Sequence, residues 1–281
     1  MSRWFRHGEQ VQDVSIDDRA FQYGDGLFET IAMRNGQPRL WDFHMDRLER
    51  GCERLGIAMP ERRSLRESLD KAAITSAEDT AYGTAKIILS SGNSQRGYAR
   101  ARPANAHTLV GIFSATPIAA LHYSNGVETR LCNTRLALYS ATAGLKTLNR
   151  LEQVLARCEC EQAGTFEGFT LDADDRLICG TMSNVFIVTN KSIITPALDR
   201  CGVEGVMRRY TIETLQENDT LVDIRDIGLD EFRQSDEVFL TNSQFGILPV
   251  RRCGDRLWQS HTVTLEIMAR MADNGIGECA L

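Results

Sequence analysis

The sequence predicts a two-lobed protein of mixed α/β class (α+β), in which strands and helices alternate without a regular βαβ period. Its length is the first observation behind this prediction, because 281 residues can build one large or two medium domains, each with its own core. The second is the stretch PIAALHYSNG at 117–126, which has the composition of a linker. We therefore expect a smaller N-terminal α/β domain over 1–118 and a larger C-terminal domain over 119–281.

The first elements of the chain are a predicted hairpin and a predicted helix. Residues 26–40 contain two extended runs on either side of Asn35-Gly36, a dipeptide that is a strong signal for a tight hairpin turn. Residues 41–57 then space their apolar side chains as an amphipathic helix does, and Gly56 marks its end.

The rest of the N-terminal half predicts a second helix over 62–77 and two further strands. One strand begins in 84–98 and runs into a Gly/Ser loop, and the other lies in 106–118 and is closed by Pro117. After the linker, the stretch 143–158 carries Lys146 just before a predicted amphipathic helix.

The C-terminal half begins with three short predicted strands in 166–196, where DADD at 172–175 forms a tight turn. A glycine followed by a helix is predicted in 201–218. Residues 236–250 predict a strand with a polar break, and 262–274 predict the closing helix.

Composition excludes several classes of function. A net charge of -6 argues against a nucleic-acid or anionic-membrane surface as the main partner, and the basic cluster at 96–102 is explained as well by a solvated loop. No apolar run approaches membrane-spanning length, and the N-terminus has no apolar signal region. The eight cysteines show neither disulfide nor zinc spacing, so we expect no metal and a reduced, cytoplasmic protein.

Three features could bind an anion such as phosphate. Gly205 precedes a predicted helix, whose first amides, those of Val206 and Met207, would then point at a ligand. Arg47 lies on a predicted helix with a histidine one turn earlier, and arginine pairs with phosphate bidentately. TNSQFG at 241–246 interrupts a strand with small and polar residues. Each feature alone is weak, since a helix-opening glycine is usually only a cap.

Lys146 can be interpreted in two ways. It stands at the N-terminal side of a predicted helix whose apolar positions, Leu148, Leu151, Val154, Leu155 and Cys158, form a core-facing stripe. Asn149 and Glu152 could form a capping box there, which leaves Lys146 as an ordinary solvated lysine. A cation at a helix N-terminus is, however, mildly unfavourable. Desolvation would lower its pKa and make it an amine nucleophile and proton carrier.

Six motifs occur in one order along the chain: DRAFQYGDGLFETI (18–31), HMDRL (44–48), GLKTLNRLEQVLA (144–156), SNVF (183–186), GVEGVMR (202–208) and EVFLTNSQFGILPV (237–250). Together they resemble the class IV aminotransferase family of pyridoxal-phosphate enzymes, of fold type IV. That family includes branched-chain and D-amino-acid aminotransferases and 4-amino-4-deoxychorismate lyase. The resemblance runs from about residue 15 to residue 252.

The resemblance implies a role for each matching position. Lys146 would form the Schiff base with pyridoxal 5'-phosphate and carry protons. The phosphate would be bound by Arg47, by the Val206 and Met207 amides and by Ser243, and the substrate side of the pocket would be lined by Tyr23 and Phe28. It also implies a homodimer with the site between the lobes, near the partner chain, and a cofactor-binding C-terminal domain.

Within the family, two stretches and one residue favour the lyase. KTLNRLEQVLA resembles the lyase's version of the lysine motif, and SSGNSQRGY resembles a lyase loop in which Arg96 would bind a substrate carboxylate. Arg96 could equally be a loop arginine that binds nothing. Asn242 also matches the lyase better than a branched-chain aminotransferase. The implied reaction converts 4-amino-4-deoxychorismate to 4-aminobenzoate and pyruvate, for folate synthesis.

Cys179 departs from the family pattern. The resemblance implies a glutamate at this position, facing the pyridine nitrogen of the cofactor and keeping it protonated. A thiol has an ordinary pKa of about 8.5 and is a weak donor, so it cannot take the role of that carboxylate. A nearby carboxylate could take that role instead. Taken alone, Cys179 is a small buried apolar residue. The alternatives to a lyase are therefore a D-amino-acid or branched-chain aminotransferase, or a catalytically impaired member of the family.

Overall fold

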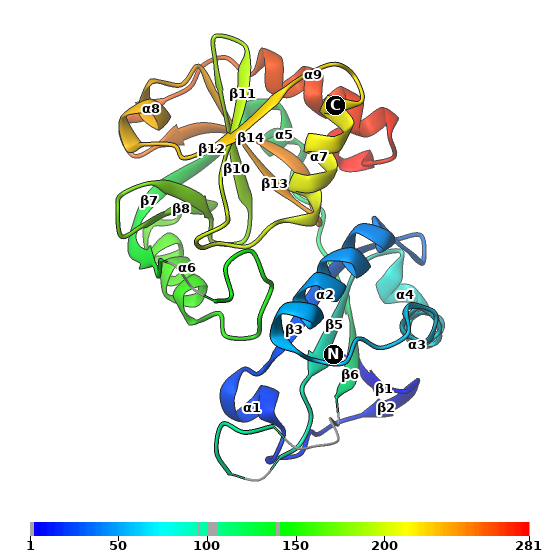
Figure 1. The fold of residues 1–281 in the computed structure, drawn as a ribbon. Coiled ribbons are helices and arrows are strands. Elements are labelled where there is room, and N and C mark those ends of the chain that lie inside the picture. Colours follow the sequence, from blue (N-terminus) through cyan, green and yellow to red (C-terminus); the bar gives the residue numbers. More distant parts are fainter. Residues whose placement is uncertain (1–2, 95, 101–105, 139–140, 281) are drawn as a thin grey trace. The chain divides into compact units, whose positions relative to one another are not determined.

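The computed structural model describes residues 3–94, 96–100, 106–138 and 141–280. The chain divides into two compact units (Figure 1). Unit 1 consists of Met1–Pro117 together with the short segment Leu145–Asn149, and unit 2 consists of Ile118–Gly144 and Arg150–Leu281. The predicted mixed α/β class is confirmed, since each unit combines a sheet with helices.

Unit 1 is built on an antiparallel sheet that, over the described residues, has six strands in the order β2-β1-β6-β5-β3-β4. The strands are β1 (Arg3–Arg6), β2 (Glu9–Val11), β3 (Gly26–Arg34), β4 (Gln37–Pro38), β5 (Tyr82–Ser90) and β6 (His107–Ser114). The helices are α1 (Arg19–Tyr23), α2 (Trp41–Leu55), α3 (Arg62–Thr75) and α4 (Ala77–Thr80). The predicted hairpin is confirmed, because Asn35 and Gly36 join β3 to β4 with φ of 50° and 75°, as a type I′ turn requires.

Helix α2 packs on β3 and buries polar as well as apolar side chains. Its buried residues include Met45, Leu48 and Cys52, which join the core of unit 1. They also include His44 and Arg47, which lie one turn apart and face the same direction. A helix that buries two basic side chains needs a compensating anion in the core.

Glu29 on β3 supplies that anion. Its carboxylate accepts hydrogen bonds from Arg47 Nε at 2.8 Å, Arg47 Nη2 at 2.5 Å and, at 2.6 Å, from His44 Nδ1. Burial raises the pKa of Glu29, but the charges and hydrogen bonds of Arg47 and His44 more than offset this and hold it at about 2. Burial lowers the pKa of His44, as do the neighbouring charges of Arg47 and Lys146, although Glu29 opposes the shift.

The predicted helix after Lys146 is confirmed, but the segment Leu145–Asn149 lies outside it. Helix α6 (Leu151–Ala163) begins five residues after Lys146, and its N-cap residue is Arg150, so the predicted Asn149 capping box is wrong. The segment pairs instead with β3: Phe28 N donates to Lys146 O at 3.0 Å, and Leu148 N donates to Gly26 O at 3.1 Å. The edge of β3 thus supplies hydrogen-bond partners for backbone groups of this segment, as a helix would have done.

The predicted core-facing stripe of α6 is also wrong. Leu151, Val154 and Leu155 are 71%, 53% and 52% exposed, and Cys158 is exposed too. The helix packs against the strands of unit 2 through its opposite face instead, which buries the small residues Ala156 and Cys160. Small side chains allow this close approach, so the larger apolar side chains remain at the surface.

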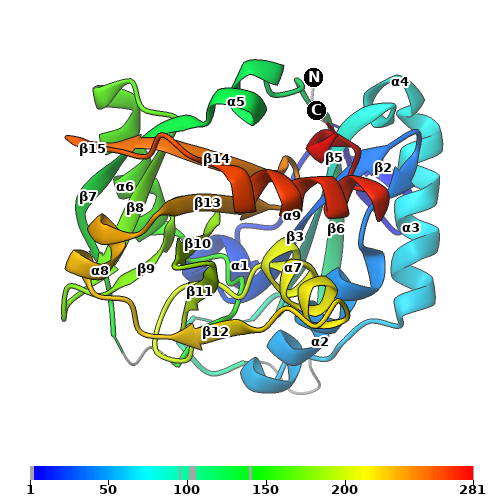
Figure 2. The same cartoon turned by 90° about the horizontal axis from the view of Figure 1, so that it is seen from above.

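Unit 2 is built on a mixed sheet in the order β12-β11-β10-β13-β14-β7-β8-β9, with β15 paired to β14. Its strands are β7 (Val127–Leu136), β8 (Glu167–Asp172), β9 (Leu177–Gly180), β10 (Asn184–Thr189), β11 (Ser192–Pro196), β12 (Val222–Arg225), β13 (Glu237–Asn242), β14 (Gly246–Cys253) and β15 (Arg256–Leu257). Its helices are α5 (Ala120–Asn125), α6, α7 (Val206–Gln216), α8 (Leu229–Gln234) and α9 (Thr262–Asp273), followed by the 3-10 turn η1 (Gly277–Cys279). Helix α9 lies along β13 and β14 (Figure 2).

Three predictions for this half need correction. The stretch taken as a linker contains α5, in which Tyr123 is buried and donates a hydrogen bond to Phe245 O. The three strands predicted for 166–196 are four, because SNVF begins a strand separate from β9. The strand with a polar break over 236–250 is a hairpin, in which β13 turns into β14. No helix among the described residues is long and apolar enough to cross a membrane.

The Glu29 network makes a prediction about acid stability. The pKa of Glu29 lies at about 2 in the folded protein against an ordinary 4.5, so its contribution is complete above pH 4.5 and is lost as the pH falls towards 2. We expect Glu29→Gln to lower the free energy of unfolding by roughly 3 kcal/mol at pH 7 and by much less at pH 3. Urea unfolding at the two pH values measures this difference.

The matched control is Glu53→Gln, because Glu53 is an exposed carboxylate on α2, the helix that carries Arg47 and His44. It should change the free energy of unfolding by less than about 0.5 kcal/mol at either pH. A Glu29→Gln effect of equal size at pH 7 and pH 3 would contradict the assignment of a buried, ionised carboxylate.

Candidate active site

Lys146 and Phe28 lie side by side on one face of the unit 1 sheet. Since Leu27 pairs with Thr147, Lys146 stands opposite Phe28, and neighbouring residues of a strand alternate between its two faces. The Lys146 ammonium lies over the Phe28 ring, with Nζ 4.4 Å from the ring centroid, within the range of a cation–π contact. The predicted nucleophile and one predicted substrate-side residue are thus brought together.

Lys86 is a second amine on this face and was missed in the sequence. It lies on β5 opposite Thr30, and its Nζ is 5.0 Å from the centroid of the Phe28 ring. Burial lowers the pKa of Lys86. A lysine inside the otherwise apolar run of a buried strand (TAKIILS) was the signal that could have identified it.

Arg47 is held in a fixed orientation by Glu29. A guanidinium that shares two parallel hydrogen bonds with one carboxylate has its plane determined by that pair. Arg47 is 7% exposed and Glu29 is 1% exposed, so the pair is desolvated. The structure therefore gives the predicted phosphate ligand a built environment, and Glu29 and His44 are its partners on β3 and α2.

Tyr23 and the loop that carries Arg96 lie together in unit 1. The Tyr23 hydroxyl accepts a hydrogen bond from Gly97 N at 3.4 Å, and the rings of Tyr23 and Tyr98 are 5.6 Å apart. The Arg96 side chain is exposed. The structure thus associates Tyr23 with the Arg96 loop and places Phe28 with Lys146.

Cys179 lies in unit 2, fully buried on β9. Its cross-strand neighbour is Thr170, whose Oγ1 donates to Cys179 O at 3.0 Å and lies 3.5 Å from Cys179 Sγ. Burial raises the pKa of the thiol to about 11, although the Thr170 contact opposes the shift, so the side chain is neutral at pH 7. The Arg150 charge is also near enough to act on Cys179. A neutral thiol beside a guanidinium does not favour a further positive charge there.

Glu167 on β8 is a buried carboxylate whose charge acts on Cys179, and its oxygens are already engaged. They accept hydrogen bonds from Thr181 N at 3.0 Å, Met182 N at 3.2 Å and Ser183 Oγ at 2.8 Å, as well as from Thr181 Oγ1. The carboxylate therefore holds the turn between β9 and β10 in place.

The other predicted anion-binding residues lie at the start of α7 and in the β13–β14 turn. Helix α7 begins at Val206 after Gly205, whose position has no room for a side chain: a Cβ there would come within 1.9 Å of Asn184 Oδ1. The amides of Val206 and Met207 open this helix. Helix α7 packs against β13, and Ser243 follows the end of β13, so these predicted phosphate-binding positions all lie in unit 2.

Asn242 has partners within the fold. Its Nδ2 donates to Met182 O at 2.5 Å and its Oδ1 accepts from Gln244 N at 2.7 Å. It thereby ties the β13–β14 turn to the turn that Glu167 holds. The structure assigns Asn242 a positional role, and its predicted contact with substrate stays a prediction.

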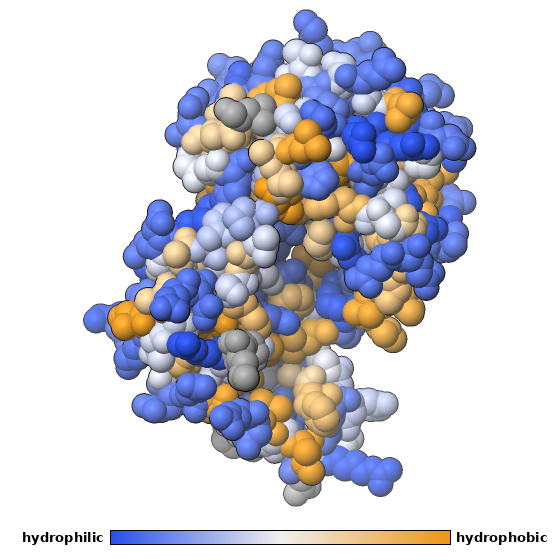
Figure 3. Space-filling view, turned by 180° about the vertical axis from the view of Figure 1, so that it is seen from behind, coloured by the Kyte–Doolittle hydropathy of each residue, from blue (hydrophilic) through white to orange (hydrophobic). Residues whose placement is uncertain are grey.

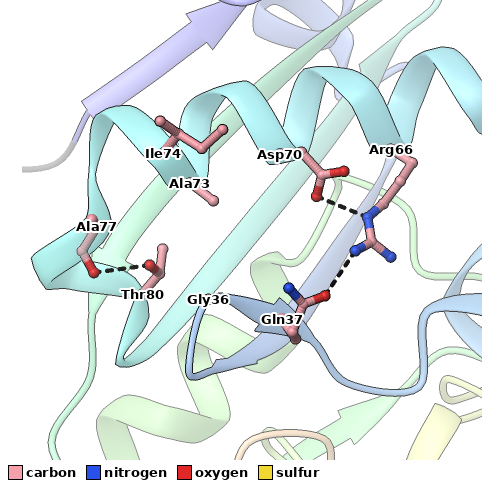
Figure 4. A pocket seen from close by; sticks show the side chains of 8 residues that line it. All are labelled: Gly36, Gln37, Arg66, Asp70, Ala73, Ile74, Ala77 and Thr80. Atoms are coloured by element: carbon pink, nitrogen blue, oxygen red, sulfur yellow. Dashed lines mark hydrogen bonds and ion pairs between the residues drawn. The ribbon is translucent and has the colours of Figure 1, made fainter.

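A separate pocket in unit 1 lies beside α3 and the β3–β4 turn (Figure 4). Arg66 reaches across it from α3 and donates to Gln37 Oε1 at 3.0 Å and to Asp70 Oδ1 at 2.8 Å. Among the described residues that line this pocket, none is a predicted site residue. The chemistry proposed for Lys146 therefore does not involve it.

Comparison with known proteins identifies the family. The family model described as amino-transferase class IV matches residues 26–253. The chain is 36% identical over 237 residues to aminodeoxychorismate lyase of Vibrio harveyi, covering 84% of this chain and 86% of that protein. It is 39% identical to the structure of 4-amino-4-deoxychorismate lyase from Pseudomonas aeruginosa, with a TM-score of 0.87 and 97% and 99% of the two chains covered.

A more distant solved structure shares the fold. The pyridoxal-phosphate-bound form of a hypothetical aminotransferase from Mycobacterium tuberculosis is 20% identical, with a TM-score of 0.81, and covers 96% of this chain and 98% of its own. This likeness shows the fold alone. With the family model matched over most of its length, the chain belongs to the class IV aminotransferase family.

Proposed function

We propose that the protein is a pyridoxal-phosphate-dependent lyase that converts 4-amino-4-deoxychorismate to 4-aminobenzoate and pyruvate, a step of folate synthesis. The observation that carries this proposal is the near full-length likeness, at 36% and 39% identity, to two proteins named for this activity. Lys146, held against Phe28, supplies the amine that such a reaction requires.

The residues present suit the aldehyde and phosphate ends of the cofactor. An amine on an aromatic face can bond covalently to an aldehyde, and Lys146 is that amine. A buried guanidinium and a helix N-terminus are phosphate-binding groups, and we assign this role to Arg47, the Val206 and Met207 amides and Ser243. When bound, pyridoxal phosphate supplies the electron sink for the chemistry at the substrate.

The proposed step divides between proton transfer and positioning. The Lys146 amine takes the proton from the ring carbon that carries the substrate nitrogen. The bond between the neighbouring ring carbon and the ether oxygen breaks, enolpyruvate leaves and is protonated to pyruvate, and the ring becomes aromatic. The substrate carries two carboxylates, and we assign the cations that face them to Arg96 and Lys86, with Tyr23, Phe28 and Asn242 lining its site.

Cys179 favours a lyase over an aminotransferase. Neither its neutral thiol nor the engaged carboxylate of Glu167 can hold a proton on the pyridine nitrogen. Aminotransfer depends on the electron sink throughout, whereas the lyase step gains driving force from the aromatic product. The alternative of a D-amino-acid or branched-chain aminotransferase draws its support from the family to which the chain belongs.

We further propose a cytoplasmic homodimer. Figure 3 shows hydrophobic residues at the surface among a hydrophilic majority. Leu151, Val154, Leu155 and Cys158 form such an exposed stripe along α6, at the spacing of one helix face. A second copy of the chain would bury it. Among the described residues no disulfide joins the cysteines, which supports a reducing compartment.

A product assay tests the lyase. Purified protein with pyridoxal phosphate and 4-amino-4-deoxychorismate should release 4-aminobenzoate and pyruvate in equal amounts, and Lys146→Ala should abolish both because it removes the amine that carries the proton. Lys71→Ala, a change at an exposed lysine of α3, is the matched control and should retain activity. Exchange of amino groups with a 2-oxo acid and no release of pyruvate would overturn the lyase in favour of an aminotransferase.

Restoring a carboxylate at position 179 tests the interpretation of Cys179. Cys179→Glu should raise aminotransferase side activity at least about tenfold more than lyase activity, because ~1.4 kcal/mol of added stabilisation acts only where the sink limits the rate. Cys179→Ser, which is neutral and nearly the same size, serves as the control and should leave the ratio of aminotransferase to lyase activity unchanged. If Cys179→Glu altered both activities equally, the interpretation would be wrong.

A charge on α6 tests the homodimer. We expect the wild-type protein to have twice the mass of the 31.4 kDa chain by light scattering and Leu155→Glu to have the mass of one chain, because the carboxylate cannot be buried in an apolar interface. Gln153→Glu, off the exposed stripe, should leave the dimer intact. A monomeric wild-type protein would disprove the homodimer, and a dimeric Leu155→Glu would place the interface elsewhere.

A further inference from the structure

The loop formed by residues 96–100 is shaped by hydrogen bonds that its carbonyl groups accept. It follows β5 and carries Arg96, Gly97 and Tyr98. Gly97 has φ of 111°, a backbone conformation that residues other than glycine rarely adopt. The carbonyls of Gly97, Tyr98 and Ala99 all bind one side chain rather than a neighbouring strand.

That side chain is Arg19, the first residue of α1. Its Nη1 donates to Gly97 O at 3.0 Å, to Ala99 O at 3.2 Å and, at 2.8 Å, to Ser94 Oγ. Its Nη2 donates to Tyr98 O at 2.9 Å. A planar guanidinium can serve several acceptors in fixed directions at once, and a lysine ammonium cannot reproduce this fork.

Asp25 neutralises Arg19 and links the loop to the start of β3. Its Oδ2 accepts from Arg19 Nε at 2.7 Å, and both its oxygens accept from Arg100, at 3.0 and 2.5 Å. Ser91 Oγ also donates to it, at 2.8 Å. Asp25 therefore anchors Arg19 at one side and the end of the loop, through Arg100, at the other.

Arg19 is placed to position rather than to bind a ligand. It is only 3% exposed, and its Nε, Nη1 and Nη2 are all engaged. Its guanidinium carbon lies 5.0 Å from the centroid of the Tyr23 ring, so it also supports the side chain that contacts Gly97. Arg19 thus contacts both the Tyr23 ring and the loop that Tyr23 contacts.

We propose that Arg19 is the positioning residue of the Arg96 loop: it holds the carbonyls of residues 97–99 and thereby determines where the Arg96 guanidinium meets a carboxylate of the substrate. The last part rests on the proposed lyase function, and the holding of the loop does not. Without Arg19, the Arg96 guanidinium would sample many orientations. Substrate binding would weaken, and the amine chemistry of Lys146 would not change.

Hydrogen exchange and steady-state kinetics on the full-length protein with pyridoxal phosphate test the two parts separately. In Arg19→Gln, amide exchange in 96–100 should be at least about tenfold faster, because the carbonyl contacts that order the loop are lost. The KM for 4-amino-4-deoxychorismate should rise about tenfold with kcat changed less than about twofold. Arg19→Lys should give intermediate values, and it remains a test if the glutamine variant fails to fold.

The matched control is Arg34→Gln. Arg34 lies at the other end of β3, where it donates to Met33 O and Gly83 O and lies over the Tyr82 ring, so it makes hydrogen bonds of the same kind away from the loop. Its substitution should leave both loop exchange and KM unchanged. In an Arg96→Gln background, Arg19→Gln should raise KM no further, because both changes remove the same contact.

The possible results discriminate between the claims. Unchanged exchange in 96–100 in both Arg19 variants would overturn the positioning role. Faster exchange with unchanged KM, or additive effects with Arg96→Gln, would overturn the link to the substrate carboxylate. A wild-type protein without lyase activity would end the proposed function, while faster loop exchange in the variants would still support the role of Arg19 in holding the loop.

Discussion

The antiparallel pairing of residues 145–149 with β3 determines the position of the lysine on which the amine chemistry of this chain depends. Two backbone hydrogen bonds, from Phe28 to Lys146 and from Leu148 to Gly26, set the register. That register puts the Lys146 and Phe28 side chains on the same face of the sheet. A slip by one residue would turn the Lys146 side chain to the opposite face of the strand, away from Phe28, so the register and the proposed chemistry are inseparable.

Three carboxylates with little exposure organise the rest of the candidate site. Glu29 fixes Arg47 on α2, Asp25 anchors Arg19 and the Arg96 loop, and Glu167 holds the turn after Cys179. Each accepts three or more hydrogen bonds, which offsets the cost of removing its charge from water. None is itself a proposed catalytic group. Arg47, the Arg96 loop and the turn after Cys179 are thus each held by an anion within their own unit.

Much of the fold could be predicted from local sequence signals, and much of the support of the site could not. Asn35-Gly36 and Gly56 identified a turn and a helix end because each imposes a backbone conformation by itself. The extended state of Lys146 depends on a partner strand more than a hundred residues earlier, which no local pattern contains. The exposed face of α6 misled for a related reason, since its apolar spacing is the same whether the core or another surface covers it. Glu167 and Lys86 were overlooked because single charged residues in apolar runs reveal their partners only in three dimensions.

The division of the chain into units has a consequence for synthesis and folding. Residues 145–149 complete the β3 edge of unit 1, yet they emerge from the ribosome only after the first strand of unit 2. Until then the Gly26–Phe28 end of β3 has no neighbour on that side, while Met33 and Arg34 at its other end already pair with β4. A nascent N-terminal half therefore presents an open strand edge, the kind of surface that recruits other chains. The lysine segment closes that edge once it has been made, so the same five residues that carry the amine also complete the sheet of unit 1.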